Sequence, residues 1–256
     1  MYRSLDSTRI IETLEQLERR VGERFPNAGL TKVCSELTQI ARETDERARM
    51  LVRPSYGLRA LSGLVFASGI ALIVYVTMQL EVKREVESVY GVLQGIDAGF
   101  NIILLMGAAV VFLVTLEARW KRQQAMSDLD ELRSIIHVID MHQLTKDPSN
   151  VSMLAAPTPS SPPRLMTPIE VIRYLDYCSE MLSLAAKVAA LYAQSSKDPA
   201  VVEASSDLQQ ITANLSAKIW QKINIAQSGL NAAAQQQAAL AAGSMTPPGP
   251  AARRGS

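Results

Sequence analysis

Two long apolar stretches without charged side chains, residues 60–80 and 98–116, constrain this 256-residue chain more than any other feature. Each is about as long as the roughly 20 residues that a helix needs to cross a hydrocarbon core about 30 Å thick. Two buried core helices of a soluble protein are the alternative, but water-soluble helices rarely contain such runs. We therefore expect an all-α integral membrane protein, with two transmembrane helices at about residues 58–80 and 96–116.

Basic side chains on the outer flanks of the two stretches predict the orientation. The connection between the stretches, residues 81–97, holds only Lys83 and Arg84 as basic residues, among three glutamates. Lys and Arg near short loops are retained on the cytoplasmic side. We expect a multi-pass protein with both termini cytoplasmic, in a bacterial inner membrane. The flanking basic residues are Arg42, Arg47, Arg49, Arg53 and Arg59 before the first stretch, and Arg119, Lys121 and Arg122 after the second.

The rest of the chain is predicted to be mostly helical. Thr167-Pro168-Ile169-Glu170 has the pattern of a capping box, with Thr167 at the N-cap and Glu170 three residues later. The expected regions are a cytoplasmic helical hairpin (1–56), the two-span hairpin (57–118), a cytoplasmic helical extension (119–146), a flexible Pro-rich linker (147–166), a second cytoplasmic helical hairpin (167–230), and a tail that is Ala/Gln-rich and then disordered (231–256).

Three apolar stripes outside the membrane have helical spacing, within residues 10–21, 30–40 and 129–139. A two-helix hairpin is too small to bury such a stripe in a core of its own. We therefore expect the first two helices to pack on other helices or on a second copy. The three stripes together favour coiled-coil-like contacts with a second copy or with another membrane protein, in addition to the lipid bilayer.

Small residues recur every four positions in both apolar stretches. Gly63, Ala67 and Ala71 lie in the first, and Gly95 and Gly99 open the second. Small residues at this spacing let helix backbones approach closely in lipid. They predict helix packing, either within the hairpin or between subunits, although Gly and Ala are also common in membrane helices in general.

Asp97 and Asn101 are the strongly polar side chains near the start of the second stretch, and they share one helix face. At 100° per residue, Asp97 lies about 200° from Gly95 and Gly99, on the opposite side of the helix. A carboxylate ring at a pore mouth selects cations, so a pore is one interpretation. The other is that Asp97 sits in water at the membrane interface and caps the helix start.

Charge and motifs argue against several other classes. The counts of Lys plus Arg (26) and Asp plus Glu (25) nearly balance, so charge gives no reason to expect nucleic-acid binding. The sequence has none of the common nucleotide-binding, metalloprotease or nucleophile-elbow motifs, so we expect no enzyme, no cofactor and no small-molecule substrate.

The residues that most often bind metals are also poorly placed for it. Cys34 and Cys178 are the two cysteines, and we expect packed thiols on the reducing side of the membrane. His137, Asp140 and His142 cluster in sequence, but the two histidines are about 140° apart around a helix. We expect no metal site there and assign these three residues to a surface or a subunit interface.

The layout resembles two groups of membrane proteins. The stretch Ala118-Arg119-Trp120-Lys121-Arg122 is similar to the basic-aromatic exit of two-helix effectors of the SLATT type, a group associated with pores in defence systems. A cytoplasmic helix before two membrane helices resembles magnesium channels of the CorA type. Of that family's Gly-Met-Asn signature, only the glycine agrees, in Tyr90-Gly91-Val92-Leu93. Neither resemblance transfers a site to this chain.

These observations favour a non-enzymatic integral membrane protein that oligomerises, as a scaffold or as a regulatory or accessory subunit of a membrane complex. The alternative is a small ion channel or pore-forming effector, with Asp97 and Asn101 near the pore mouth.

Overall fold

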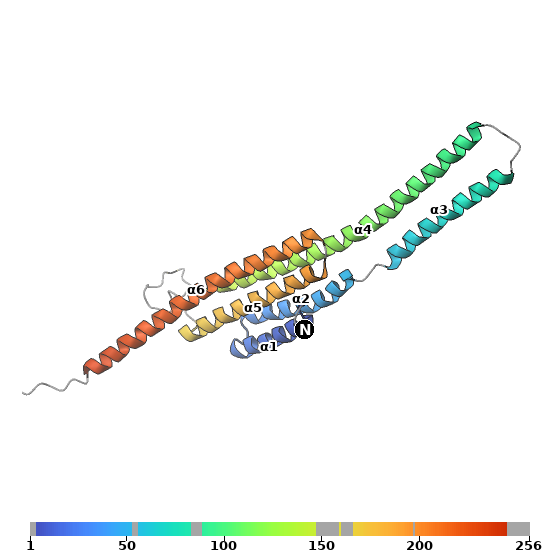
Figure 1. Cartoon of the computed structure of the whole chain (residues 1–256). Coiled ribbons are helices and arrows are strands. Elements are labelled where there is room, and N and C mark those ends of the chain that lie inside the picture. Colours follow the sequence, from blue (N-terminus) through green and yellow to red (C-terminus); the bar gives the residue numbers. More distant parts are fainter. Residues whose placement is uncertain are drawn as a thin grey trace, which may run out of the picture.

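The computed structural model describes residues 4–52, 56–82, 89–146, 159, 166–196 and 198–244. These residues form an elongated all-α structure, in which α3 and the first half of α4 project from one end and the last part of α6 projects from the other (Figure 1). Within them, the helices are α1 (Ser7–Arg24), α2 (Gly29–Val52), α3 (Tyr56–Val82), α4 (Val89–Leu144), α5 (Pro168–Ser195) and α6 (Pro199–Ser244).

The first two helices form an antiparallel hairpin for local reasons. The Asp6 side chain caps α1 by accepting a hydrogen bond from the Thr8 backbone amide at 3.0 Å. The helix ends before Pro26, and Asn27 has a φ of 70°, in the left-handed region that asparagine tolerates better than most residues. The chain therefore reverses here, and α2 packs back along α1.

α1, α2, the second half of α4, α5 and α6 pack into what we call the helix bundle. The stripe of α1 is buried, as its four-three spacing predicts, and so are the stripes of α2 and of the second half of α4. All three enter one core, to which α5 and α6 also contribute. Of the two expected ways to cover these stripes, other helices or a second copy, the structure shows the first, because five helices of the same chain cover them together. The stripes therefore give no separate reason to expect a second copy.

α3 and residues 89–120 of α4 form what we call the apolar hairpin. Its two helices contact each other. Away from this contact, most of the side chains described in the apolar hairpin are exposed. α4 runs without a break from the apolar hairpin into the helix bundle, as the sequence predicts. Its 56 residues correspond to roughly 84 Å at 1.5 Å per residue.

Some predicted boundaries differ from those of the structure. α3 and α4 extend beyond the predicted spans of 58–80 and 96–116, and α6 continues to Ser244, past the predicted end at residue 230. The capping box at Thr167 is present: its side chain accepts from the Glu170 amide, and the Glu170 side chain accepts from the Thr167 amide. Most of the predicted linker, together with Arg53, Lys83 and Arg84, lies outside the described residues.

Candidate functional site

The apolar hairpin is the candidate membrane region. Within the described residues, one helix stretch, Leu93–Leu144, contains a window long and apolar enough to cross a membrane, and Arg59–Tyr75 is a shorter apolar stretch. Length and composition alone are weak evidence, because the core helix of a soluble protein passes the same test. A core helix would be buried, however, and none of this apolar window is buried inside the structure.

The exposed side chains of the apolar hairpin include its largest apolar residues. Leu64 and Phe66 of α3 and Phe100 and Leu105 of α4 are all more than half exposed, with Leu105 at 70%. Soluble proteins rarely expose apolar patches larger than a few hundred Å² unless the patch serves binding. The described part of the chain therefore leaves these apolar side chains largely uncovered.

The two helices of the apolar hairpin meet at Gly69. A Cβ atom at this position would collide with the Met106 side chain, so glycine permits the contact. Gly95 and Gly99 lie within about 20° of Met106 around α4 and are half-buried, although a Cβ at Gly99 would meet nothing within 4 Å. Both predicted α4 glycines therefore lie on the side of α4 that faces α3, and Gly99 does not make the close approach.

The predicted small-residue stripe of α3 lies on the other side of that helix. Gly63, Ala67 and Ala71 are exposed, whereas Ser62, Val65 and Gly69 are half-buried. Any packing role of the exposed stripe would therefore be between subunits and not within the apolar hairpin. Gly69 was not among the predicted packing residues, although Ser62 and Gly69, two helical turns apart, are a signal for this face.

Asp97 and Asn101 do lie together, as their spacing predicts. The Asn101 Nδ2 donates to Asp97 Oδ2 at 3.4 Å, and both side chains are exposed. Asp97 is nine residues from Met106, which places it about 180° from the contact with α3. The interpretation of Asp97 as a helix cap is wrong, because α4 begins eight residues earlier, at Val89.

A basic and aromatic groove follows the apolar part of α4. Arg119, Trp120 and Arg122 line a shallow groove of about 600 Å³ together with apolar side chains of the same helix. Trp120 is exposed, and Arg122 Nη1 lies 3.9 Å from Asp198 Oδ2 at the start of α6. Amphipathic rings and basic side chains of this kind favour the headgroup region of a bilayer.

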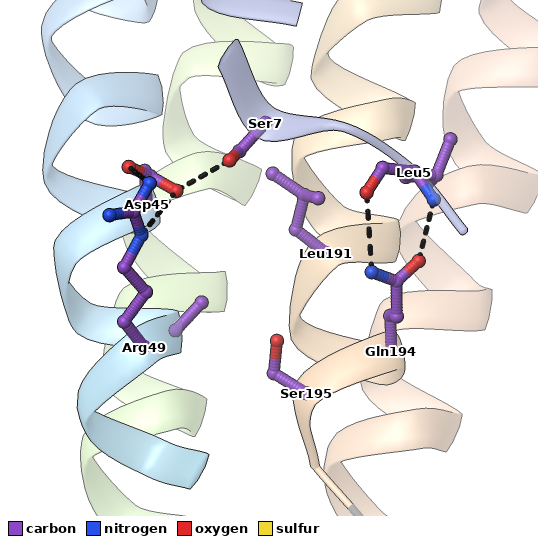
Figure 2. Close-up of a pocket in the computed structure, with 8 residues that line it drawn as sticks. Leu5, Ser7, Asp45, Arg49, Leu191, Gln194 and Ser195 are labelled. Carbon is purple, nitrogen blue, oxygen red and sulfur yellow. Dashed lines mark hydrogen bonds and ion pairs between the residues drawn. The ribbon is translucent and has the colours of Figure 1, made fainter. Parts of the chain in front are cut away.

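A pocket of about 370 Å³ lies where the chain start crosses α2 and α5 (Figure 2). Several of its polar groups hydrogen-bond to one another. The Leu5 amide donates to Gln194 Oε1 at 2.7 Å, and Gln194 Nε2 donates to the Leu5 carbonyl at 3.3 Å. Asp45 Oδ1 accepts from Ser7 Oγ and from Arg49 Nε. The residues around the pocket therefore tie the N-terminal segment to the bundle.

A buried carboxylate connects three helices of the bundle. Asp128 of α4 is 4% exposed, and it accepts from Arg47 Nη1 of α2 at 2.8 Å, from Gln124 Nε2 at 3.0 Å and from the Tyr192 hydroxyl of α5 at 3.1 Å. Burial lowers the pKa of Arg47, but the carboxylates of Asp128 and Glu43 outweigh it, so the net pKa is raised and the guanidinium stays charged. The sequence alone gave no sign of this network.

His142 is a half-buried member of the predicted histidine cluster. Its Nδ1 lies 3.1 Å from the Tyr174 hydroxyl, and a Cβ at Gly29 would be 2.6 Å from its Cε1. Burial, and then the charge of Lys146, lower the pKa of His142. His137 is exposed, and Asp140 accepts instead from Gln143. The structure therefore does not bring the three predicted residues together.

Both cysteines are free and buried, as predicted, and burial raises the pKa of each thiol to about 12. Across the residues that the structure describes, no group of three or more His, Cys, Asp or Glu is arranged to hold a metal ion. Comparison of the chain with protein-family models, curated proteins and solved structures finds no match.

Proposed function

We propose that this chain is a non-enzymatic integral membrane protein, a scaffold or accessory subunit whose apolar hairpin spans the bilayer twice. The observation that carries the proposal is the contrast in burial along α4, which is exposed and apolar in its first half and buried in a core in its second half. An exposed apolar surface on both helices is stable in lipid and costly in water.

The unbroken α4 suggests what such a protein would do. A continuous helix that leaves the membrane and enters a packed bundle holds the bundle at a fixed distance and direction from the bilayer. The Arg47–Asp128–Tyr192 network fixes α2 and α5 to the same helix close to this junction. A bundle held rigidly at the membrane fits a structural role.

The orientation proposed is the one that the charges predict, with the bundle and both termini in the cytoplasm. The two native cysteines are buried, so an introduced cysteine is the accessible thiol. Ser88→Cys places it in the connection between the two apolar stretches, and Ser228→Cys places it on the exposed surface of α6. A membrane-impermeant maleimide should label Ser88→Cys in intact cells and Ser228→Cys only after lysis.

Two results would overturn this proposal. One is equal labelling of both variants in intact cells, because a two-span hairpin places them on opposite sides. The other is full-length protein that stays in the supernatant after high-speed centrifugation without detergent.

A cation-conducting pore is the second candidate, and the exposed Asp97–Asn101 pair favours it. The pair lies on the side of α4 away from α3, so several copies would have to surround the path. Protein in liposomes should then conduct ions, and Asp97→Asn should reduce the flux. Asp130→Asn, on the exposed bundle surface of the same helix, is the matched control. Absence of flux from wild-type protein would remove this candidate.

A further inference from the structure

α6 continues well past the helices that cover it in the bundle. Lys222 Nζ donates to the carbonyl and the Oε1 of Gln143, at 3.1 and 2.7 Å, so Lys222 lies level with the last turn of α4. α6 nevertheless runs to Ser244. We call residues 227–244 the α6 extension, which projects away from the bundle on the side opposite the apolar hairpin (Figure 1).

The buried stripe of α6 continues into this extension with unchanged spacing. Ile219, Ile223 and Ala226 are buried in the bundle. The same face continues outside the bundle at intervals of four, three, four and three residues, through Leu230, Ala233, Gln237 and Leu240. Leu230 is half-buried and Leu240 is 70% exposed. Thus a face that packs against other helices inside the bundle is left uncovered beyond it.

The extension also lacks charge. No Lys, Arg, Asp or Glu occurs between residues 223 and 244. In a coiled coil, charges on the two positions flanking the apolar seam select the partner. Here those positions hold Gln227, Gly229, Ala234 and Gln236. They give no basis for choosing a charged partner and no repulsion against a second copy of the same helix.

We propose that the α6 extensions of two copies pack together as a parallel coiled coil through Leu230, Ala233, Gln237 and Leu240. The parallel direction rests on the proposed function, because two chains anchored in one membrane point their extensions the same way. Gln237 would then face Gln237 of the second copy, and a polar side chain at such a position fixes the register. Anchoring in one membrane also raises the effective concentration of the two extensions.

The chain's own connection between α4 and α5 is a poorer occupant of this face. Residues 147–166 contain five prolines. Proline removes a backbone donor and clashes with the preceding turn, so a composition of this kind disfavours the continuous helix that seam packing needs.

Two substitutions of the same kind test the proposal in native membranes. Gln237→Cys places a thiol in the seam, and Gln235→Cys places one on the outer face of the same turn. Both positions are exposed in the single chain, and the native thiols are buried. Under mild oxidation, Gln237→Cys should form a disulfide-linked dimer, whereas Gln235→Cys should not. The reason is that only seam positions bring the two Cα atoms within about 7 Å of each other.

A disulfide-linked dimer from both variants, or from neither, would overturn the coiled coil. Crosslinking of neither variant is also the result expected if another protein or another segment covers this face. Fractionation of the same samples without detergent separates this failure from that of the proposed function. Protein that pellets without crosslinking at residue 237 overturns the coiled coil alone. Protein in the supernatant overturns the membrane anchor, whatever the crosslinking shows.

Discussion

The two halves of α4 contain similar apolar residues in very different surroundings. In the apolar hairpin, Phe100 and Leu105 are largely exposed, and apolar side chains occur on every side of the helix, with Asp97 and Asn101 as polar exceptions. In the helix bundle, Leu132 and Ile136 are fully buried, and charged residues such as Asp130 occupy the outer face.

The difference concerns the pattern of hydrophobicity more than its amount. A striped helix needs partner helices on one side and water on the other, and the bundle supplies both. A helix that is apolar all round needs apolar surroundings all round. One neighbour, α3, covers only part of the first half of α4, so the same helix is suited to two solvents.

The largest expected effect comes from the same truncation in each half. Leu132→Ala should lower the free energy of unfolding of the bundle by roughly 2–5 kcal/mol, because it removes packed atoms and leaves a cavity. Leu105→Ala should change it by less than about 0.5 kcal/mol, since that side chain has few contacts within the chain. Urea unfolding in mild detergent, followed by circular dichroism, measures both. Equal losses would contradict the division of α4 into two regions.

Introducing a charge on the exposed surface should have its larger effect in the apolar hairpin, the reverse of the order expected for truncation. Leu105→Arg should disfavour membrane insertion by roughly 2.5–3.5 kcal/mol, the cost of a basic side chain at the centre of a membrane helix. Met141→Arg, on the exposed bundle surface of the same helix, should have little effect. Carbonate extraction of membranes measures the inserted fraction. An inserted fraction unchanged by Leu105→Arg would mean that this surface does not lie in lipid.

Removing the positive charge of Arg47 and removing the negative charge of Asp128 should destabilise the bundle by different amounts. Arg47→Met leaves Asp128 buried with only neutral donors, and should cost roughly 2–3 kcal/mol of unfolding free energy, near the lower limit for a broken buried pair. Asp128→Asn should cost less, because Arg47 is 34% exposed and keeps Glu43 and Glu131 as partners. Urea midpoints in detergent test this order. A larger loss from Asp128→Asn would show that Arg47 depends on this one carboxylate.

Local features of the fold were predictable from the sequence. The stripe of α1, the capping box at Thr167 and the burial of both cysteines follow from spacing and residue type, which need no knowledge of distant contacts. The exposed Asp97–Asn101 pair follows from the same rule, because residues four apart share a helix face.

Three features were not predicted from the sequence: the shared core and the Asp128 network, which depend on contacts distant in sequence, and the end of α6, where the composition was misleading. Periodicity shows that a helix has a buried face but not which helices cover it, so the sequence left open whether other helices, a second copy or another protein cover the three stripes, and did not predict that all three enter one core. Asp128 lies beside the apolar stripe of α4, and it bonds to Arg47 and Tyr192, which are distant in sequence. The end of α6 was placed too early because repeated Ala and Gln suggested low complexity, although alanine has the highest helix propensity.

The N-cap of α5 should give a smaller effect. Thr167→Ala should lower the bundle's unfolding free energy by about 1 kcal/mol, because the Glu170 amide loses its acceptor. Thr167→Ser keeps the hydroxyl and should retain most of the stability. The urea midpoints of the two variants measure the difference. Equal losses would show that the methyl group, and not the cap, stabilises this helix start.

The smallest effect expected is a pH dependence from His142. Its pKa is lowered in the folded chain, first by burial and then by Lys146, so the unfolded state binds the proton more readily. The stability that the neutral ring contributes is therefore present above the unfolded pKa of about 6.5, and it is lost as the pH falls below that value. The groups that face the ring are the Tyr174 hydroxyl, which stays protonated, and the ammonium of Lys146. Urea midpoints at pH 7.5 and 5.5 should converge in His142→Gln but not in His137→Gln, whose side chain is exposed on the same helix. A pH dependence unchanged by His142→Gln would assign it to other groups of the bundle.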